Sequence, residues 1–346
     1  MESYLYSLIG TFCVTYFSLL ALKPVAEKVG LMDEPGERKI HDTATPMVGG
    51  LGIYLSTALI LYLLIPDVFR HYLLLLSLCA LLLFVGAWDD LRGLSVRTRF
   101  YAQIAAVMLM CVVGGNQLTS FGNLYGFGSV NLGILSIPIT VLAGVGIVNA
   151  INMSDGMDGL SAGLVTISLS FLGCLAYTKN EFQLLTIISI LICALCAFLL
   201  LNFRLPWKLP ALIYLGDSGS TFLGFSLAWF LIESTQGEDP LMPPALALWF
   251  IAIPLLDTVY LLIQRVLDNK SPFQPGTDHL HHRLLSSGYS LRETVLIMYG
   301  LSVLIGALGF VAYLNGASER YLFASFVGLF IIYFLTSYNR EIKVRC

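Results

Sequence analysis

The stretch QLLTIISILICALCAFLLL (residues 183–201) decides the fold, because it is a long, mostly apolar run without a single charge. Crossing the roughly 30 Å hydrocarbon core of a bilayer takes about 17 to 25 helical residues, so this stretch can span a membrane. The whole chain has the same character: 57% of its 346 residues are hydrophobic, 12% are charged, and the mean hydropathy is +0.81. Soluble domains have about 25% charged residues. The sequence therefore predicts an integral membrane protein.

Charged and Gly/Pro-rich breaks divide the chain into about eleven predicted membrane spans. The class predicted is an all-α, polytopic transmembrane protein, and an odd number of spans places the two termini on opposite sides. The predicted spans are 3–22, 48–65, 71–87, 100–114, 134–151, 160–177, 183–201, 211–232, 243–263, 292–313 and 321–338.

The distribution of Lys and Arg predicts the orientation, because positively charged loops are retained in the cytoplasm. With the N-terminus outside and the C-terminus cytoplasmic, sixteen of the 19 Lys and Arg residues lie inside. Only Arg70, Lys179 and Arg320 are then outside. The net charge of -3 excludes a nucleic-acid partner, which would need a concentrated basic surface.

Acidic and histidine side chains gather at the predicted cytoplasmic ends of the spans. Carboxylates beside apolar spans are costly, so they are first interpreted as functional. The residues concerned are Asp89, Asp90, Asp155, Asp158, Asp217, Asp257, His279, His281 and His282. We therefore expect one domain, 1–346, whose active-site face is formed by cytoplasmic loops 23–47, 88–99, 152–159, 202–210 and 264–291.

A divalent cation would relieve the repulsion between these carboxylates, and hard cations prefer oxygen ligands. Mg²⁺ usually takes one or two carboxylates and completes its octahedron with waters and substrate phosphates, so a phosphate-bearing substrate is predicted. The histidines could bind zinc, transfer protons or hold phosphate oxygens. An ordinary polar loop, a cation-coupled secondary transporter and a non-catalytic membrane scaffold are the alternatives. No repeat between the two halves supports a transporter.

Five motifs together resemble the polyprenyl-phosphate N-acetylhexosamine-1-phosphate transferase family, over nearly the whole chain. They stand in the family's order and approximate spacing. The motifs are TPMVGG (45–50), GAWDDLRG (86–93), NAINMSDGMDGL (149–160), YLGDSGS (214–220) and SPFQPGTDHLHH (271–282).

Within that family, AIPLLD (252–257) and the HLHH form of the histidine motif resemble the branch that primes O-antigen and related surface polysaccharides. The muramyl-pentapeptide branch usually has three consecutive histidines, whereas Leu280 interrupts them here. The resemblance implies transfer of GlcNAc-1-phosphate from UDP-GlcNAc to undecaprenyl phosphate, with release of UMP, in lipopolysaccharide biosynthesis. It also implies a multi-pass protein of the bacterial inner membrane. Another UDP-N-acetylhexosamine donor, and a homodimer, are left open.

The resemblance also implies roles for individual residues. Asp158 and Asp217 match magnesium ligands, for which Mn²⁺ would be a substitute. Asp89 and Asp90 match the acids that engage the lipid phosphate. The nucleotide contacts match Asn152, Asp155, Lys39 and Tyr214, on which uracil would stack, and the pyrophosphate and sugar contacts match His279, His281 and His282, with Arg265 as a helper.

Joining two anions makes charge neutralisation and alignment the main catalytic task. Direct attack by the lipid phosphate needs no covalent enzyme intermediate, whereas a two-step route would use Asp89 or Asp90 as nucleophile. We favour direct attack. The second pKa of a phosphate, near 6, leaves it mostly ionised at neutral pH, so a strong base is not required.

Overall fold

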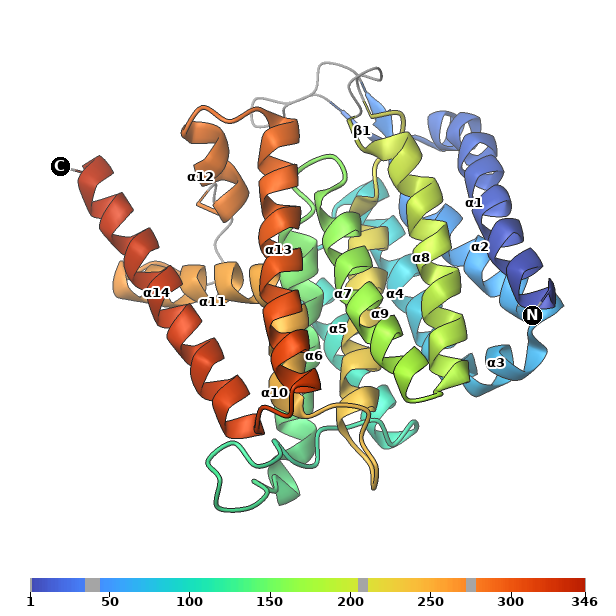
Figure 1. Cartoon of the computed structure of the whole chain (residues 1–346). Helices are drawn as coiled ribbons and strands as arrows, with labels where there is room; N and C mark the ends of the chain where they lie inside the picture. The colour runs from blue at the N-terminus through green and yellow to red at the C-terminus, as the bar shows by residue number, and fades with distance from the viewer. Residues whose placement is uncertain (1, 35–43, 205–210, 272–277, 346) are drawn as a thin grey trace.

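The structure is a computed structural model that describes residues 2–34, 44–204, 211–271 and 278–345. Within these ranges it is a bundle of α-helices with one small antiparallel sheet, formed by β1 (Met32–Asp33) and β2 (Thr45–Pro46). Figure 1 shows most of the long helices side by side, with α12 at one end of the bundle and α3 at the other. The predicted helical class is confirmed.

The helices of the described ranges follow one another with short connections, apart from the segment between α5 and α6. They are α1 (Glu2–Val29), α2 (Gly49–Leu64), α3 (Pro66–His71), α4 (Leu73–Arg92), α5 (Val96–Val112), the 3-10 turn η1 (Gly133–Leu135), α6 (Ser136–Met153), α7 (Leu160–Thr178), α8 (Phe182–Asn202), α9 (Gly216–Thr235), α10 (Pro244–Phe250), α11 (Ala252–Leu267), α12 (Leu280–Ser286), α13 (Leu291–Leu314) and α14 (Glu319–Arg345).

Helix α9 forms the centre of the bundle. It packs against α2, α4, α6 and α7, and nearly all of its side chains are buried. Its first half, GDSGST, is made of small residues, which let neighbouring backbones approach closely inside a membrane. The site-bearing start of α9 is therefore held by protein on several sides.

Seven helices of the described ranges are long and apolar enough to cross a membrane, or eight if the bent pair α10 and α11 counts as one span. The protein is thus a multi-pass membrane protein. Helices α2 and α5 coincide with predicted spans but have only 16 and 17 residues. Helix α9 is long enough, but Gly, Ser and Thr lower its hydropathy. The total of eleven spans stays a prediction.

The predicted ninth span, 243–263, is wrong as a single straight helix, because α10 and α11 meet at an angle of 90°. Pro254 lacks the N–H that would bond to the carbonyl of Phe250, so the helix cannot continue through this point. The Ser168 hydroxyl of α7 donates to that carbonyl at 2.7 Å and replaces the lost bond. Figure 1 shows α11 lying across the direction of α13.

Two other predicted boundaries differ from the structure. The eighth span was predicted from 211, but α9 begins at Gly216, which has a φ of +78° and ends the preceding segment. Helix α4 continues past the predicted end at 87 to Arg92, so Asp89 and Asp90 lie in its last turn. Both acids are therefore placed by a helix and have defined directions.

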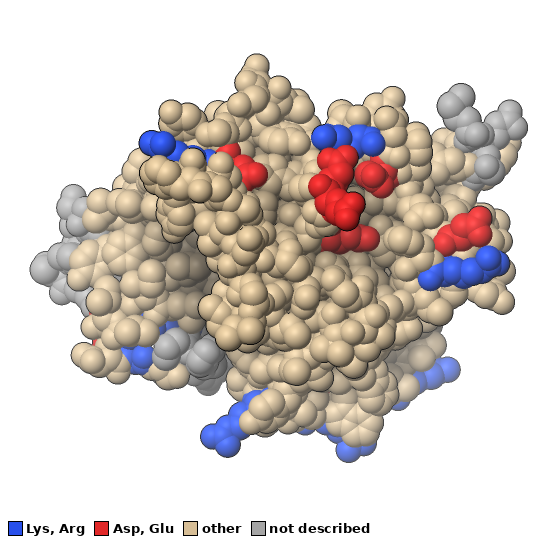
Figure 2. All heavy atoms as spheres, turned by 90° about the horizontal axis from the view of Figure 1, so that it is seen from below, with Lys and Arg blue, Asp and Glu red and all other residues tan. Residues whose placement is uncertain are grey.

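The two ends of the bundle differ in their charged groups. Figure 2 looks onto the end opposite α12, where charged side chains form separate small groups on an otherwise uncharged surface. On this face, Arg70 of α3 pairs with Asp67 at 3.5 Å, and both side chains are exposed. The predicted orientation would place this face outside the cell.

Cysteine labelling tests this orientation at two exposed positions on opposite ends of the bundle. In a background without accessible native cysteines, Asp67→Cys should react with an impermeant thiol reagent in intact cells, whereas Asp278→Cys should react only after permeabilisation, because the positive loops stay inside. The reverse pattern would invert the orientation. Equal labelling from outside would refute an inward-facing site.

Candidate active site

The start of α9 is the structural centre of the candidate site. The Asp90 carboxylate accepts hydrogen bonds from the backbone N–H groups of Asp217 at 2.9 Å and Ser218 at 3.2 Å. The first N–H groups of a helix have no partner within the helix, and a carboxylate there is also favoured by the helix dipole. Asp90 therefore caps α9 from the last turn of α4.

Glycines in two of the sequence motifs let the helices meet at this point. A Cβ at Gly86 of α4 would collide with the Cα of Ser218, and one at Gly50 of α2 would collide with the Cα of Gly219. The close approach of α2, α4 and α9 thus depends on residues without side chains.

The TPMVGG motif holds the chain that leads into α9. Gly49 N–H donates to the carbonyl of Tyr214 at 2.9 Å, Gly50 N–H to that of Leu215 at 3.1 Å, and Tyr214 N–H to that of Pro46 at 2.8 Å. These backbone bonds fix Tyr214 directly before the capped helix. The motif therefore has a positioning function in the site.

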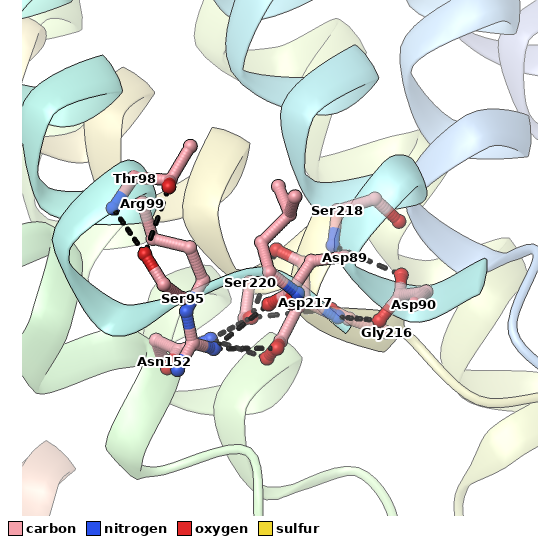
Figure 3. Close-up of polar contacts among 11 residues, drawn as sticks. Asp89, Asp90, Ser95, Thr98, Arg99, Asn152, Gly216, Asp217, Ser218 and Ser220 are labelled. Atoms are coloured by element: carbon pink, nitrogen blue, oxygen red, sulfur yellow. Dashed lines mark hydrogen bonds and ion pairs between the residues drawn. The ribbon is translucent and has the colours of Figure 1, made fainter. Parts of the chain in front are cut away.

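Arg99 joins two of the predicted site acids. Its guanidinium lies 2.9 Å from the Asp89 carboxylate and 2.9 Å from that of Asp217. The other Asp217 oxygen accepts from the Asn152 side-chain amide at 2.8 Å, and the same amide contacts the Ser220 hydroxyl at 2.9 Å (Figure 3). Helices α4, α5, α6 and α9 are thereby linked by one polar network.

A second arginine pairs with the other predicted metal ligand. Arg204 forms an ion pair with Asp158, and both side chains are largely buried. Next to Asp158, Gly159 donates its N–H to the Asn202 side chain, whose amide donates to the carbonyl of Ile213 at 2.8 Å. The loop after α6 is therefore fixed against the end of α8.

A cavity of about 430 Å³ lies between these elements. Seven of the predicted site residues line it, namely Asp90, Asn152, Asp155, Asp158, Tyr214, Asp217 and His282. Asp89, His279, His281 and Arg265 are described but do not line it. Lys39 lies outside the described residues. The structure thus brings together acids from three separate connections, together with the predicted aromatic.

Burial and neighbouring charges both act on Asp155. Its removal from bulk water raises the pKa of Asp155 well above the ordinary value, and the carboxylates of Asp217, Asp90 and Asp158 raise it further. A carboxyl with this pKa holds a proton unless a cation reduces the negative potential. The cavity is therefore a place where positive charge is favoured.

This pKa shift predicts a pH-dependent effect of Asp155→Asn on stability. Because the folded pKa is raised, the stabilisation from the bound proton is complete below about pH 4 and is lost as pH rises through the raised pKa. With EDTA present, Asp155→Asn should raise the Tm in detergent at pH 8 and leave it nearly unchanged at pH 4.5.

Asp67→Asn is the matched control, since Asp67 is 86% exposed at the other end of the bundle. It should leave the Tm unchanged at both pH values. A lower Tm for Asp155→Asn at pH 8 would show that the carboxylate is already compensated by its surroundings.

The histidine motif forms α12, beside the cavity. His281 is only 2% exposed, and its ring lies parallel to that of His279 at a centroid distance of 5.6 Å. A Cβ at Gly156 would lie 2.7 Å from His281 Nε2, so this glycine makes room for the ring. Burial, with His282 and His279 nearby, lowers the pKa of His281 to about 3. His281 is therefore neutral at physiological pH.

Asp257 does not behave as expected from the sequence, which suggested Arg265 as its structural partner. Its carboxylate lies 2.9 Å from His279 Nδ1 and 3.2 Å from Arg283 Nη2. Arg265 is buried in the last turn of α11. Asp257 thus belongs to the histidine helix.

The cavity suits a hard divalent cation by its donor chemistry. In the described part of the chain, no three Asp, Glu, His or Cys side chains converge as a ready metal cluster. Mg²⁺ needs only one or two carboxylates when a phosphate substrate supplies further oxygens. Asp158 and Asp217 both line the cavity, and the raised pKa of Asp155 shows uncompensated negative charge between them. These residues fit the ion.

Sequence reasoning missed Arg99 and Arg204 as site residues and counted them only as loop charges. A local signal existed for Arg99: Ser95 accepts from Thr98 N–H and begins α5, which places Arg99 in the first helical turn after the Asp89 motif. The partner choice depends on contacts between α5 and α9, which are far apart in sequence. Arg204 has no comparable local signal.

Comparisons with known proteins agree with this geometry. A family described as Glycosyl transferase family 4 matches residues 72–235. The chain is also similar to proteins named undecaprenyl-phosphate alpha-N-acetylglucosaminyl 1-phosphate transferase. That of Haemophilus influenzae is 36% identical over 96% of this chain and 93% of its own length. That of Escherichia coli K12 is 32% identical over 94% of this chain and 89% of its own length.

The matched family segment runs from α4 to the end of α9 and so contains the capped helix, the acids and most of the cavity. The relatives extend the similarity over almost the whole chain. The predicted family resemblance is confirmed, and the chain belongs to the polyprenyl-phosphate sugar-1-phosphate transferases of glycosyl transferase family 4.

Proposed function

We propose that the protein transfers GlcNAc-1-phosphate from UDP-GlcNAc to undecaprenyl phosphate in a Mg²⁺-dependent reaction, on the cytoplasmic side of a bacterial plasma membrane. The products are UMP and undecaprenyl-diphospho-GlcNAc, the first lipid-linked intermediate of a surface polysaccharide such as O-antigen. The carrying observation is the cavity, in which four carboxylates face an aromatic and a basic side chain at one end of a membrane-embedded bundle. Relatives at 32% to 36% identity carry the corresponding name.

In the proposed reaction, an oxygen of the lipid phosphate attacks the β-phosphorus of UDP-GlcNAc. The bond from this phosphorus to the oxygen that bridges the two phosphates breaks, and that oxygen leaves with UMP. When bound, Mg²⁺ would be held by Asp158 and Asp217 and would supply charge neutralisation to the pyrophosphate, with Mn²⁺ as a substitute.

The chain's own residues would bind and orient the two anionic substrates. Tyr214 is held by backbone bonds at the cavity wall and offers a ring for uracil, and Asn152 offers amide contacts to the nucleotide. Arg204 and Arg99 lie beside the proposed metal ligands, so they can pair with phosphate oxygens once a cation takes the carboxylates. Such positioned charges lower the barrier by stabilising the crowded phosphates.

The contacts of Asp89 and Asp90 support direct attack over a covalent route. Both oxygens of Asp90 accept from the start of α9, and Asp89 is held by Arg99 and by the N–H of Leu94. A nucleophile would need a free oxygen in line with the β-phosphorus. These acids are better suited to holding α4, α5 and α9 in register beside the lipid phosphate.

The test mixes purified protein in detergent with radiolabelled UDP-GlcNAc, undecaprenyl phosphate and Mg²⁺, and measures lipid-linked label and UMP. Equal amounts of both should form, and EDTA should stop the reaction until Mg²⁺ or Mn²⁺ is restored. A panel with UDP-GalNAc and UDP-glucose tests the donor. Faster transfer from another UDP-N-acetylhexosamine would change the donor but keep the reaction, and activity unaffected by EDTA would refute the metal.

A further inference from the structure

A buried carboxylate outside the cavity collects four hydrogen-bond donors at the base of the histidine helix. Asp257 of α11 lies 2.9 Å from His279 Nδ1 and accepts from Leu280 N–H at 2.9 Å, from Arg283 Nη2 at 3.2 Å and from the Tyr333 hydroxyl at 2.9 Å. The Asp257 side chain is 9% exposed. Such a set of charge-assisted bonds fixes direction as well as distance.

Helix α12 depends on this carboxylate for its placement. It has seven residues, and a helix this short is not stable by itself. His279 stands before its first turn without a side-chain cap, and Asp257 takes the N–H of Leu280 in place of one. The direction in which α12 leaves the preceding loop is therefore set from α11.

The C-terminal helix α14 completes the arrangement through Tyr333. Its hydroxyl donates to Asp257 and accepts from Arg283, so Asp257, Arg283 and Tyr333 form a closed ring of contacts between α11, α12 and α14. The Arg283 guanidinium also lies over the ring of Tyr260, at 4.9 Å from its centroid. Figure 1 shows α14 as the outermost helix beside α12, far in sequence from the capped start of α9.

We infer that Asp257 and Tyr333 are positioning residues for the transfer reaction, which hold His279 and α12 against the donor side of the cavity. This inference rests on the proposed function. A carboxylate at Nδ1 fixes the neutral imidazole with its proton on Nδ1 and leaves Nε2 as the nitrogen that can face a substrate. Through the parallel rings of His279 and His281, the same contacts set the seat of the buried histidine next to Gly156.

Tyr333→Phe is the sharpest test, because it keeps the aromatic ring and removes only the hydroxyl. Losing the bonds to Asp257 and Arg283 should lower kcat roughly tenfold and raise the KM for UDP-GlcNAc, while the KM for undecaprenyl phosphate stays unchanged. Tyr313→Phe is the matched control. It removes a hydroxyl bond of 3.2 Å to the Leu241 carbonyl near the opposite end of the bundle and should leave all three constants unchanged.

A merely structural role would lower the Tm of Tyr333→Phe but leave kcat and both KM values of the folded enzyme unchanged, and that result would overturn the inference. A double-mutant cycle adds a second criterion. In a His279→Ala background, Tyr333→Phe should cause no further loss, because its effect passes through that histidine. Independent, multiplying losses would overturn it too. If the unmodified protein transferred no sugar phosphate, the proposed function itself would fail.

Discussion

Asp217→Asn should lower the rate of sugar-phosphate transfer at least about a hundredfold, while the protein still inserts and purifies normally. The substitution keeps the size of the side chain and its contact with Asn152, but it removes the charge that faces Arg99 and the cavity. A proposed metal ligand that loses its charge should also raise the Mg²⁺ concentration needed for half-maximal rate. Asp158→Asn should behave in the same way.

Arg99→Ala separates a metal ligand from a mere partner of the arginine. If Asp217 acts only by holding Arg99, then Arg99→Ala will reproduce the loss seen with Asp217→Asn, and neither variant will change the Mg²⁺ dependence. If Asp217 holds the cation, only Asp217→Asn shifts that dependence. Asp67→Asn, at an exposed ion pair on the other face, is the control for purification and assay. Near-normal rates for Asp217→Asn at limiting Mg²⁺ would exclude it as a ligand.

His281→Ala should lower turnover roughly ten- to a hundredfold and weaken donor binding, with the affinity for the lipid phosphate nearly unchanged. A lost hydrogen bond to a charged group costs about 1.5–3 kcal/mol, and each 1.4 kcal/mol is tenfold. With a pKa lowered to about 3, His281 would act as a neutral N–H donor. His281→Gln places a neutral amide near the position of Nε2 and should recover part of the activity.

The pH dependence of stability gives an independent check on His281. Because its folded pKa lies below the ordinary value near 6.5, its contribution to stability is present above that pH and is lost as pH falls. The Tm of the parent protein should therefore drop more steeply below pH 6.5 than that of His281→Gln. Protection by added zinc would instead indicate a structural metal, and unchanged kinetics in His279→Ala, His281→Ala and His282→Ala would exclude the histidine motif from the site.

The helices could be predicted because each long apolar run has only one stable form inside a bilayer, where every backbone polar group needs an internal partner. The run around 183–201 became α8 almost without change. The ninth span failed for a reason visible only in three dimensions. Pro254 could have produced a mild kink, but the Ser168 hydroxyl on another helix satisfies the Phe250 carbonyl and permits a right-angle bend.

The membership of the site was predictable, whereas its pairing was not. Functional motifs drew attention to Asp90, Asp217 and Tyr214, and the structure brings them to one cavity. That Asp90 caps α9 could not be inferred, because its partners are backbone N–H groups 127 residues further along the chain. Arg99 was missed for the same reason, since a surface arginine and a site arginine look alike until the facing helix is known.

The fate of the β-phosphate tests the central claim most directly. UDP-GlcNAc labelled with ³²P in the β-phosphate and with ³H in the sugar is incubated with the purified protein, undecaprenyl phosphate and Mg²⁺, and the lipid is extracted. The proposed reaction moves both labels into the lipid in equal amounts and leaves unlabelled UMP. Transfer of ³H alone, with ³²P retained in UDP, would show ordinary glycosyl transfer and would contradict the account, as would a lipid fraction without either label.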